Sequence, residues 1–264
     1  MPIVRRRRRP FVIEVTHRQI ELARLPAAFA GLRLVQLSDI HHGLYMPSER
    51  VTQAVELANR LEPDLVALTG DFVSNSVNYI EPVAEALGRL RAPLGVFAVL
   101  GNHDYRVGAH RVAAALERHA IAVLRNRHVC LARGSASLFV AGVDDGRHKQ
   151  DNLRQALAGT SPETTTLLLC HNPAILPLAA ACGVELILSG HTHGGQIGMP
   201  RLRSLAAARG LRLPLAHGWR EFNGTKLYVS RGLGTVILPI RFRCPAEIPV
   251  LQLQPTRGSC SSQS

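Results

Sequence analysis

A short apolar run ending in polar, metal-competent side chains decides the fold, and it reads LRLVQLSDIH over residues 32–41. The run is rich in Leu and Val and does not alternate strictly between apolar and polar residues. Such a pattern is typical of a strand that is buried on both faces of a parallel sheet. Asp39 and His41 follow this strand directly, so they are expected at its carboxyl end.

Four later segments repeat this pattern of an apolar run followed by a polar cluster. They are residues 65–71, 96–104, 167–173 and 186–193, which carry Asp71, the triplet Asn102-His103-Asp104, His171 and the pair His191 and His193. Helical patterns lie between the runs, after Ser48 and at residues 81–90, 109–119, 152–158 and 174–181. Strands that alternate with helices predict an α/β fold with a largely parallel core.

Other strands complete the expected architecture. Residues 121–124, 129–131 and 136–141 are closely spaced strands and predict a local antiparallel patch. Residues 226–230 and 250–253 are two further strands. We therefore predict a layered sandwich with sheets inside and helices outside. Residues 11–255 form its single domain, between a basic disordered tail at 1–10 and a C-terminal tail at 256–264.

The composition restricts the class of protein and of partner. The chain has 264 residues, 46% of them hydrophobic, and a net charge of +12. This charge favours anionic partners such as phosphorylated substrates, lipid surfaces or nucleic acid, although a solvated basic surface explains it equally well. The five cysteines include no CxxC pair, which argues against a zinc knuckle or a redox motif and favours reduced thiols in the cytoplasm.

No membrane segment is expected from the sequence. No apolar run reaches the roughly 18 to 20 residues that a spanning helix needs, and the N-terminus has no signal-peptide pattern. The run Arg5–Arg9 has two interpretations. It is either a disordered basic tail or a peripheral contact with anionic lipid.

The polar residues at the strand ends predict a metal centre. Ligands of open α/β sheets bind beyond the carboxyl ends of the strands, and these residues offer carboxylates, an amide oxygen and imidazoles. Such donors suit Mn, Fe, Co, Ni or Zn. Seven donors fit two ions that share a carboxylate, about 3.5 to 4 Å apart. The i, i+2 pairs Asp39/His41 and His191/His193 are expected on extended backbone, so that both members of a pair reach one centre.

The order of these blocks, over roughly residues 33–235, resembles the calcineurin-like metallophosphoesterases. The resemblance implies a four-layer αββα sandwich of two mixed sheets and a centre with two divalent ions. Its ligand sets would be Asp39, His41 and His193 for the first ion and Asn102, His171 and His191 for the second, with Asp71 bridging both. His103 would contact the phosphoryl oxygen or protonate the leaving group, and Asp104 would orient or polarise His103.

The resemblance also implies an activity, namely hydrolysis of a phosphodiester or pyrophosphate by a metal-bridging hydroxide. Residues 37–41, 190–196 and 228–234 resemble a bacterial subgroup that includes broad phosphodiesterases and the UDP-diacylglucosamine pyrophosphatases of lipid A biosynthesis. Members of that subgroup often sit at the inner membrane. The expected substrate is therefore a phosphorylated small molecule or a lipid-linked one, and the protein would be cytoplasmic or peripheral on that membrane.

Two alternatives and three further residues complete the expectations. A nuclease is disfavoured because the chain has no aromatic-basic platform for single strands, so no specific nucleic-acid partner is expected. A non-catalytic module that binds an anionic ligand is disfavoured because every ligand position keeps a metal-competent residue. Gln196, Arg231 and His42 are candidate substrate contacts. The pattern does not fix an oligomeric state.

Overall fold

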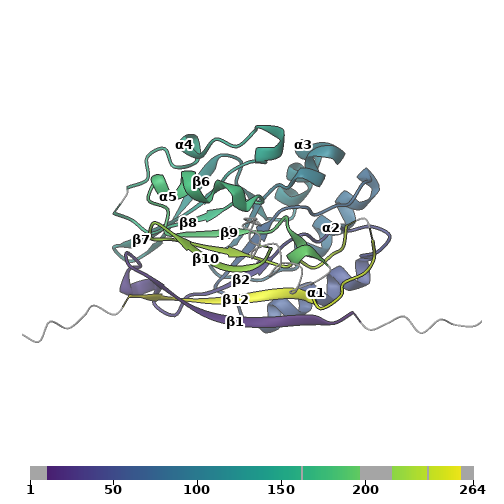
Figure 1. Ribbon diagram of the computed structural model, residues 1–264, viewed down its shortest axis with the longest axis horizontal. Helices are drawn as coiled ribbons and strands as arrows, with labels where there is room; N and C mark the ends of the chain where they lie inside the picture. The colour runs from purple at the N-terminus through teal and green to yellow at the C-terminus, as the bar shows by residue number, and fades with distance from the viewer. Residues whose placement is uncertain (1–10, 162, 197–215, 237, 257–264) are drawn as a thin grey trace, which may run out of the picture.

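The computed structural model describes residues 11–161, 163–196, 216–236 and 238–256. The predicted tail at residues 1–10 and nearly all of the predicted tail at 256–264 lie outside these ranges. The described chain forms two six-stranded sheets, which lie face to face between helices (Figure 1).

The first sheet is built mainly from the N-terminal half of the chain. Its order is β1 (Ile13–Leu22), β12 (Ala246–Pro255), β2 (Arg33–Leu37), β3 (Leu65–Thr69), β4 (Val96–Val99) and β5 (Ala122–Val123). The four strands β2 to β5 are parallel to one another, while β12 runs antiparallel to β2. The carboxyl ends of β2, β3 and β4 therefore share one edge of the sheet.

The second sheet comes from the C-terminal half. Its order is β10 (Gly218–Phe222), β11 (Thr225–Val229), β9 (Leu186–Ser189), β8 (Thr166–Leu169), β7 (Ala136–Gly142) and β6 (Arg127–Arg133). The central strands β11, β9, β8 and β7 are parallel, and the edge strands β10 and β6 are antiparallel to their neighbours.

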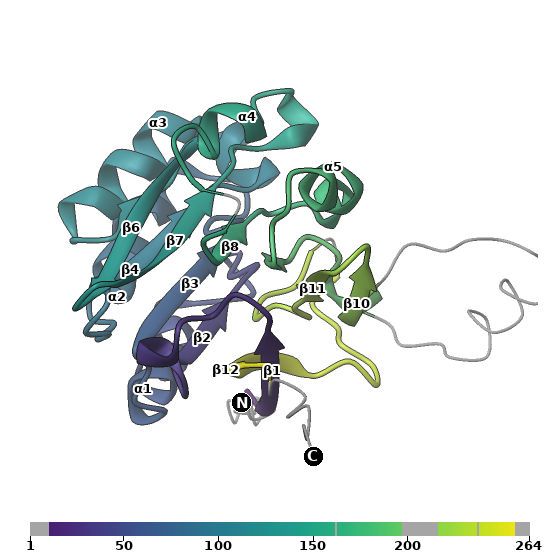
Figure 2. The ribbon, with the colours of Figure 1, turned by 90° about the vertical axis from the view of Figure 1, so that its left-hand side faces the viewer.

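Three apolar clusters hold the layers together, and they confirm the predicted α/β sandwich. Between the sheets, leucines such as Leu34, Leu65, Leu167 and Leu186 pack together, all fully buried. The outer face of the first sheet is covered by α1 (Ser48–Arg60), α2 (Ile80–Leu87) and α3 (Asn102–Arg118). That of the second sheet is covered by α4 (Leu153–Ala156) and α5 (Leu176–Ala181). Figure 2 shows α1, α2 and α3 on one side of the sheets and α5 on the other.

Several elements differ from the sequence prediction. The strands predicted at 121–143 do not form one patch. β6 and β7 form a hairpin in the second sheet, whereas β5 is the parallel edge strand of the first. β1 and β10 were not predicted, because an edge strand leaves much of its surface to solvent and alternates polar with apolar residues. Among the described residues, no helix combines the length and apolarity required to cross a bilayer.

Candidate metal centre

The candidate ligands gather where the carboxyl edges of the two sheets meet. β2, β3 and β4 end shortly before Asp39, Asp71 and Asn102, and β8 and β9 end shortly before His171 and His191. The two edges are joined directly, since the backbone N–H of His191 donates to both carboxylate oxygens of Asp39 over 3.0 Å. Five strand ends thus deliver their side chains to one place, and all of these side chains except His191 belong to buried residues.

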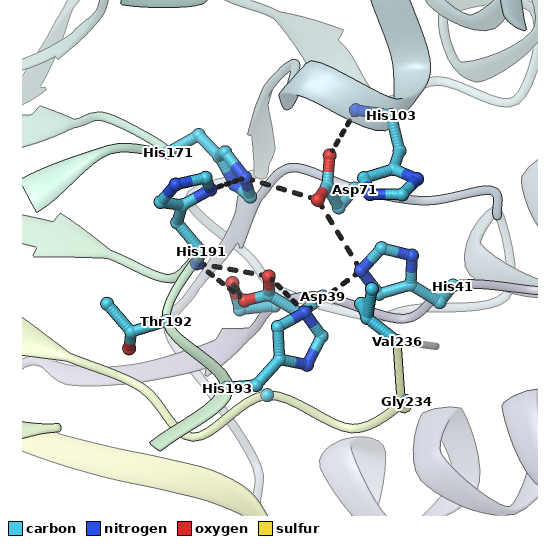
Figure 3. Close-up of polar contacts among 12 residues, drawn as sticks. Asp39, His41, Asp71, His103, His171, His191, Thr192, His193, Gly234 and Val236 are labelled. Atoms are coloured by element: carbon cyan, nitrogen blue, oxygen red, sulfur yellow. Dashed lines mark hydrogen bonds and ion pairs between the residues drawn. The ribbon is translucent and has the colours of Figure 1, made fainter. Parts of the chain in front are cut away.

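A first group of ligand atoms comes from Asp39, His41, Asp71 and His193. The Nε2 atoms of His41 and His193 lie 3.1 Å apart. His193 Nε2 lies 3.3 Å from Asp39 Oδ1, and His41 Nε2 lies 3.4 Å from Asp71 Oδ2. Figure 3 shows the two rings directed toward the two carboxylates.

A second group comes from Asp71, His171 and His191. His171 Nε2 lies 3.3 Å from Asp71 Oδ2 and 3.1 Å from His191 Nδ1. The other ring nitrogen of His171, Nδ1, donates to the carbonyl of Thr69 over 2.8 Å. A carbonyl can only accept, so this bond keeps a proton on Nδ1 and leaves Nε2 as the atom that faces Asp71. Asp71 Oδ2 therefore belongs to both groups.

The spacings within both groups fit ligands around metal ions. Donor atoms bound at about 2.0–2.2 Å and separated by angles of about 90–110° lie about 2.8–3.6 Å apart. The five distances given above range from 3.1 to 3.4 Å. A hydrogen bond between the rings would explain one close nitrogen pair. Two such pairs that flank one carboxylate oxygen fit a metal centre better.

Asn102 supplies an independent indication of a missing partner. Its Oδ1 atom is buried and has no hydrogen-bond partner among the described residues. An unsatisfied buried carbonyl costs free energy, so it calls for a specific explanation. A metal ion held beside it would satisfy this oxygen, and the amide oxygen is a suitable donor for the metals named above.

The backbone of the ligand residues departs from the extended conformation that we predicted. All but two of the seven candidate ligands have a left-handed backbone, with φ of 50° at Asp39, 50° at His41, 56° at Asp71, 72° at His191 and 52° at His193. This conformation is uncommon in residues with a Cβ atom, and it concentrates at functional sites. His191 and His193 nevertheless reach the same centre and join different groups, in agreement with the ligand sets that the resemblance implies.

Two glycines allow the close approach of these turns. A Cβ atom on Gly190 would lie 1.9 Å from Ser38 Oγ and 2.2 Å from Asp39 Oδ2. One on Gly101 would lie 2.2 Å from Asp71 Oδ1. Neither contact is sterically allowed, so these positions need glycine for the two sheet edges to bring their carboxylates together.

Electrostatics keep most of the histidines ready to bind a cation. Burial lowers the pKa of His41 to about 3 and that of His191 to about 4, and it also lowers the pKa of His193. These rings are neutral at pH 7 and keep a free lone pair. Burial also disfavours the charged form of His171, but the Asp71 carboxylate outweighs this effect and raises the pKa of His171 to about 10. A metal ion at this position would take over the partnership with Asp71 from the proton.

His103 lies beside the first group without being part of it. Its ring is edge-on to that of His41, with centroids 4.7 Å apart, and its backbone N–H donates to Asp71 Oδ1 over 2.7 Å. His103 Nδ1 donates to the carbonyl of Ser74 over 2.9 Å. The residue that orients the His103 ring by a hydrogen bond is thus Ser74, whereas we expected Asp104 to orient or polarise it. Nε2 of His103 is left for other contacts.

Asp104 contacts backbone groups instead of the His103 ring. Its Oδ2 accepts from the N–H groups of Gly101 and Asp71, and its Oδ1 accepts from those of Phe72 and Val73. Burial and the Asp71 carboxylate raise the pKa of Asp104 to about 7, against the N–H donors, which favour the ionised form. The carboxylate therefore fixes the turn that carries Asp71.

The three predicted substrate contacts have protein partners in the structure. His42 is buried, with Nδ1 at 2.8 Å from the carbonyl of Met46. Arg231 pairs with Glu247 over 3.0 Å and with Glu14 over 3.1 Å. Gln196 is hydrogen-bonded to the segment that follows Val236. A substrate role for each stays a prediction.

Arg241, which was not predicted from the sequence, supports the first group. Its guanidinium donates to the carbonyls of Arg231, Gly232 and Gly234. That turn in turn packs on the ligand strand, since Gly234 N donates to the carbonyl of Asp39 over 2.7 Å. No local motif marks Arg241, because its partners are carbonyls that only the folded turn brings together.

Comparison with known proteins agrees with this geometry. Residues 32–195 match the Calcineurin-like phosphoesterase family. The metallophosphoesterase YkuE of Bacillus subtilis is 32% identical over 251 residues, which cover 94% of this chain and 87% of the relative. A metallophosphoesterase of Aquifex aeolicus is 32% identical and is covered over 93% of its length. A cattle transmembrane protein with a metallophosphoesterase domain is 34% identical, and this chain spans 57% of its length.

A solved structure supports the fold alone. The NAD nucleotidase of Haemophilus influenzae superposes with a TM-score of 0.51 at 17% identity, over 76% of this chain and 50% of that one. Three findings agree: the family match, the two sheets with their flanking helices, and the buried Asp/His groups. The chain belongs to the calcineurin-like phosphoesterase family and is a metallophosphoesterase.

Proposed function

We propose that the protein holds two divalent metal ions and hydrolyses a phosphodiester or a pyrophosphate. The observation that carries the proposal is the position of Asp71 Oδ2, which lies 3.4 Å from His41 Nε2 and 3.3 Å from His171 Nε2. One carboxylate oxygen between two imidazole groups is the arrangement that a shared bridging ligand requires. Asp39, His41 and His193 complete the first site, and Asn102, His171 and His191 complete the second.

The residues of this chain bind and orient the reacting groups. When bound, two divalent ions supply a water of lowered pKa as nucleophile and neutralise charge on the phosphoryl oxygens. Asp39 and Asp71 provide two negative charges against the four of two divalent cations, so the centre keeps an excess of positive charge that attracts a phosphate group. The hydrogen bond from His171 Nδ1 to Thr69 keeps that ring from rotating away.

His103 is the proposed general acid. Its Nδ1 is committed to the Ser74 carbonyl, so the ring is held with Nε2 as the atom that exchanges a proton. In the imidazolium form, Nε2 donates to the leaving oxygen as the P–O bond breaks. Asp104 is a positioning residue, because it fixes the turn of Asp71 and does not reach the reacting atoms.

A lipid-linked diphosphate such as UDP-diacylglucosamine is the alternative substrate. Two observations favour an amphiphile. The name of the cattle relative joins this domain to a transmembrane protein, and an apolar groove lies beside the metal centre, as described below. Under this alternative, the protein is cytoplasmic and peripheral on the inner membrane, with Arg5–Arg9 near anionic lipid. Residues 11–255 act as one domain.

One experiment tests the proposal on the purified protein. Bound metals are measured, and turnover is compared on bis(p-nitrophenyl) phosphate, a nucleotide sugar and UDP-diacylglucosamine with Mn, Fe, Co, Ni or Zn. We expect two ions per chain and hydrolysis of at least one substrate. Asp71→Asn should lose both ions and about a thousandfold or more in turnover, whereas Glu56→Gln on an exposed position of α1 should lose neither.

Two results would contradict the proposal. The first is a wild-type protein that is inactive with each of the five metals on every substrate. The second is an Asp71→Asn variant that keeps both ions and its turnover. Activity on the diester alone would remove the lipid-linked alternative and leave the reaction class intact.

A further inference from the structure

A groove of about 610 Å³ opens beside the metal centre. Its lining is mostly apolar and includes Phe11, Val12, Leu44, Tyr45 and Ile240. These residues come from three segments that are far apart in the sequence, namely the start of β1, the turn after β2 and the stretch before β12. Apolar side chains from separate segments thus meet at one place on the surface.

The apolar side chains at this groove are unusually exposed. Nine large hydrophobic residues are exposed in the described part of the chain. Four of them, Val12, Leu44, Tyr45 and Ile240, line the groove. Two others, Leu238 and Phe242, belong to the same segment as Ile240. Leu44 is 80% exposed and Phe242 is 57% exposed. Four such residues at one groove, with two more in an adjoining segment, mark an interaction surface.

Hydrogen bonds hold this surface in its exposed form. The side chain of Gln196 donates to the carbonyls of Leu238 and Ile240 over 3.0 and 3.2 Å and accepts from Val236 N over 2.6 Å. Its backbone carbonyl accepts from Phe242 N over 3.0 Å. Four bonds from one residue fix the backbone, so the apolar side chains are held at the surface.

The groove is coupled to the first ligand group. Leu44 follows His41 by three residues, and Gln196 follows His193 by three residues. The turn at Leu233 and Gly234, which lines the groove, donates two hydrogen bonds to the carbonyls of Ser38 and Asp39. Figure 3 shows Gly234 and Val236 next to His41 and His193. One wall of the groove is therefore built directly on the turn that carries Asp39.

The charged residues that line the groove are all of one sign. Arg50 and Arg241 line it, and none of its lining residues is acidic. Arg50, Arg241 and the exposed Arg243 form no ion pair with a carboxylate within the described residues. In the sequence, Arg5–Arg9 directly precede Pro10 and the groove residue Phe11.

We propose that this face docks on an anionic lipid bilayer and brings the metal centre to the level of the headgroups. Exposed aliphatic and aromatic side chains insert at the boundary between headgroups and acyl chains, while arginines contact anionic headgroups. The combination of apolar side chains with Arg50 and Arg243, which have no carboxylate partner in the described structure, and a lining without acids selects a lipid surface over a neutral apolar partner. The inference extends the proposed function by stating where the substrate is met, but docking needs no turnover.

The test measures binding of the full-length protein to vesicles by flotation. The vesicles are phosphatidylcholine alone or phosphatidylcholine with phosphatidylglycerol. We expect binding to the anionic vesicles and about tenfold weaker binding for the double variant Ile240→Ser/Phe242→Ser. The matched control is Leu178→Ser/Phe222→Ser, which removes two apolar side chains that are exposed by 55% and 41% on α5 and β10. This control should bind as the wild type does.

Three outcomes would overturn the proposal. One is equal vesicle binding by the Ile240/Phe242 variant and the wild type, which would leave charge alone as the cause. Another is no binding of the wild type to either vesicle. The third is a dimer in sedimentation velocity that dissociates in this variant, which would assign the groove to a second copy of the chain.

The metal chemistry is separated from docking by two further measurements. Asp71→Asn should bind vesicles as the wild type does. The Ile240/Phe242 variant should hydrolyse a water-soluble diester at the wild-type rate. A protein that is inactive yet binds vesicles through this face would contradict the proposed function only.

Discussion

The backbone N–H of Asp71 donates a hydrogen bond to Oδ2 of Asp104 over 2.9 Å. A carboxylate at the start of α3 thus fixes the turn that carries Asp71, the residue common to both candidate ligand groups. Asp104 accepts hydrogen bonds from four backbone N–H groups in all. It therefore holds the whole turn in place.

Replacing Asp104 should therefore damage both stability and metal binding. In Asp104→Ala, four buried N–H groups lose their acceptor, and we expect a loss of about 2–4 kcal/mol in the free energy of unfolding. Urea denaturation of the metal-free protein measures this loss. Metal affinity should fall as well, because Asp71 is no longer held. An Asp104→Ala protein with unchanged stability would refute the role that we assign to the carboxylate.

Asn102→Ala should separate metal binding from folding. The substitution removes a buried oxygen that has no hydrogen-bond partner in the described structure, so the metal-free protein should lose less than about 1 kcal/mol of stability. The same change removes a proposed ligand, so metal should raise the melting temperature less than in the wild type. Thermal melts with and without metal provide the measurement, and an equal metal-induced shift in both proteins would contradict ligation by Asn102.

His103→Ala should lower turnover by an amount that depends on the leaving group. A general acid is worth about 10²–10⁴-fold, and most of this benefit disappears when the leaving group is already a weak base. We expect a large loss on an alkyl phosphodiester and a small loss on a p-nitrophenyl diester, with metal content unchanged. His17→Ala, on the exposed face of β1, is the control. Equal losses on both substrates would argue for a role in positioning.

Glu247 should contribute to stability in a manner that depends on pH. Burial would raise its pKa, but hydrogen bonds from Arg231, Tyr228 and Thr16 outweigh burial and lower it from 4.5. A carboxyl group with a lowered folded-state pKa stabilises the fold above its unfolded pKa and loses this contribution as the pH falls through the folded value. Glu247→Gln should cost about 1–3 kcal/mol at pH 7 and less below pH 4.5. Unfolding free energies measured from pH 7 to 3 should therefore converge, and parallel curves would count against this role.

Arg241→Met should weaken the first ligand group selectively. The variant keeps much of the side-chain length but loses the donors to the carbonyls of the 231–234 turn, which packs on Asp39. We expect about 10- to 100-fold weaker binding of one metal ion and little change for the other. Arg243→Met removes the same charge from an exposed position and should leave both affinities unchanged. Calorimetric titration with metal distinguishes the two ions.

The sequence predicted which side chains gather at the candidate site, but it did not predict the backbone conformation of those residues. Asp71, His171 and the others could be found because each follows a buried apolar run, and parallel strands place such positions at one edge. The left-handed backbone of Asp39 and His41 could not be found in this way, since neither residue is a glycine and no local motif marks the conformation. The acceptor for His103 was misassigned for a similar reason. Ser74 lies 29 positions away, and only the fold brings its carbonyl there.

The edge strands β1 and β10 were also missed, for a physical reason. Their residues face solvent along much of their length, so no run of apolar side chains reveals them. Gln196 shows the limit of reasoning from a motif. Its place after His193 suggested a contact with substrate, which stays a prediction, but gave no sign that its amide donates to the carbonyls of Leu238 and Ile240.

At the candidate metal centre, the two sheets are joined by residues that are far apart in the sequence. Asp39 and His191, which are hydrogen-bonded to each other, are 152 positions apart. An ion bound between the two sheet edges would act as a removable cross-link. It would close a long loop, as a disulfide does. Neither half of the polypeptide can assemble such a site alone, so loading must follow the docking of the sheets during folding. Removal of metal by a chelator should therefore weaken the contact between the two sheet edges first. The loops at these edges should become sensitive to proteases while the strands of each sheet stay paired.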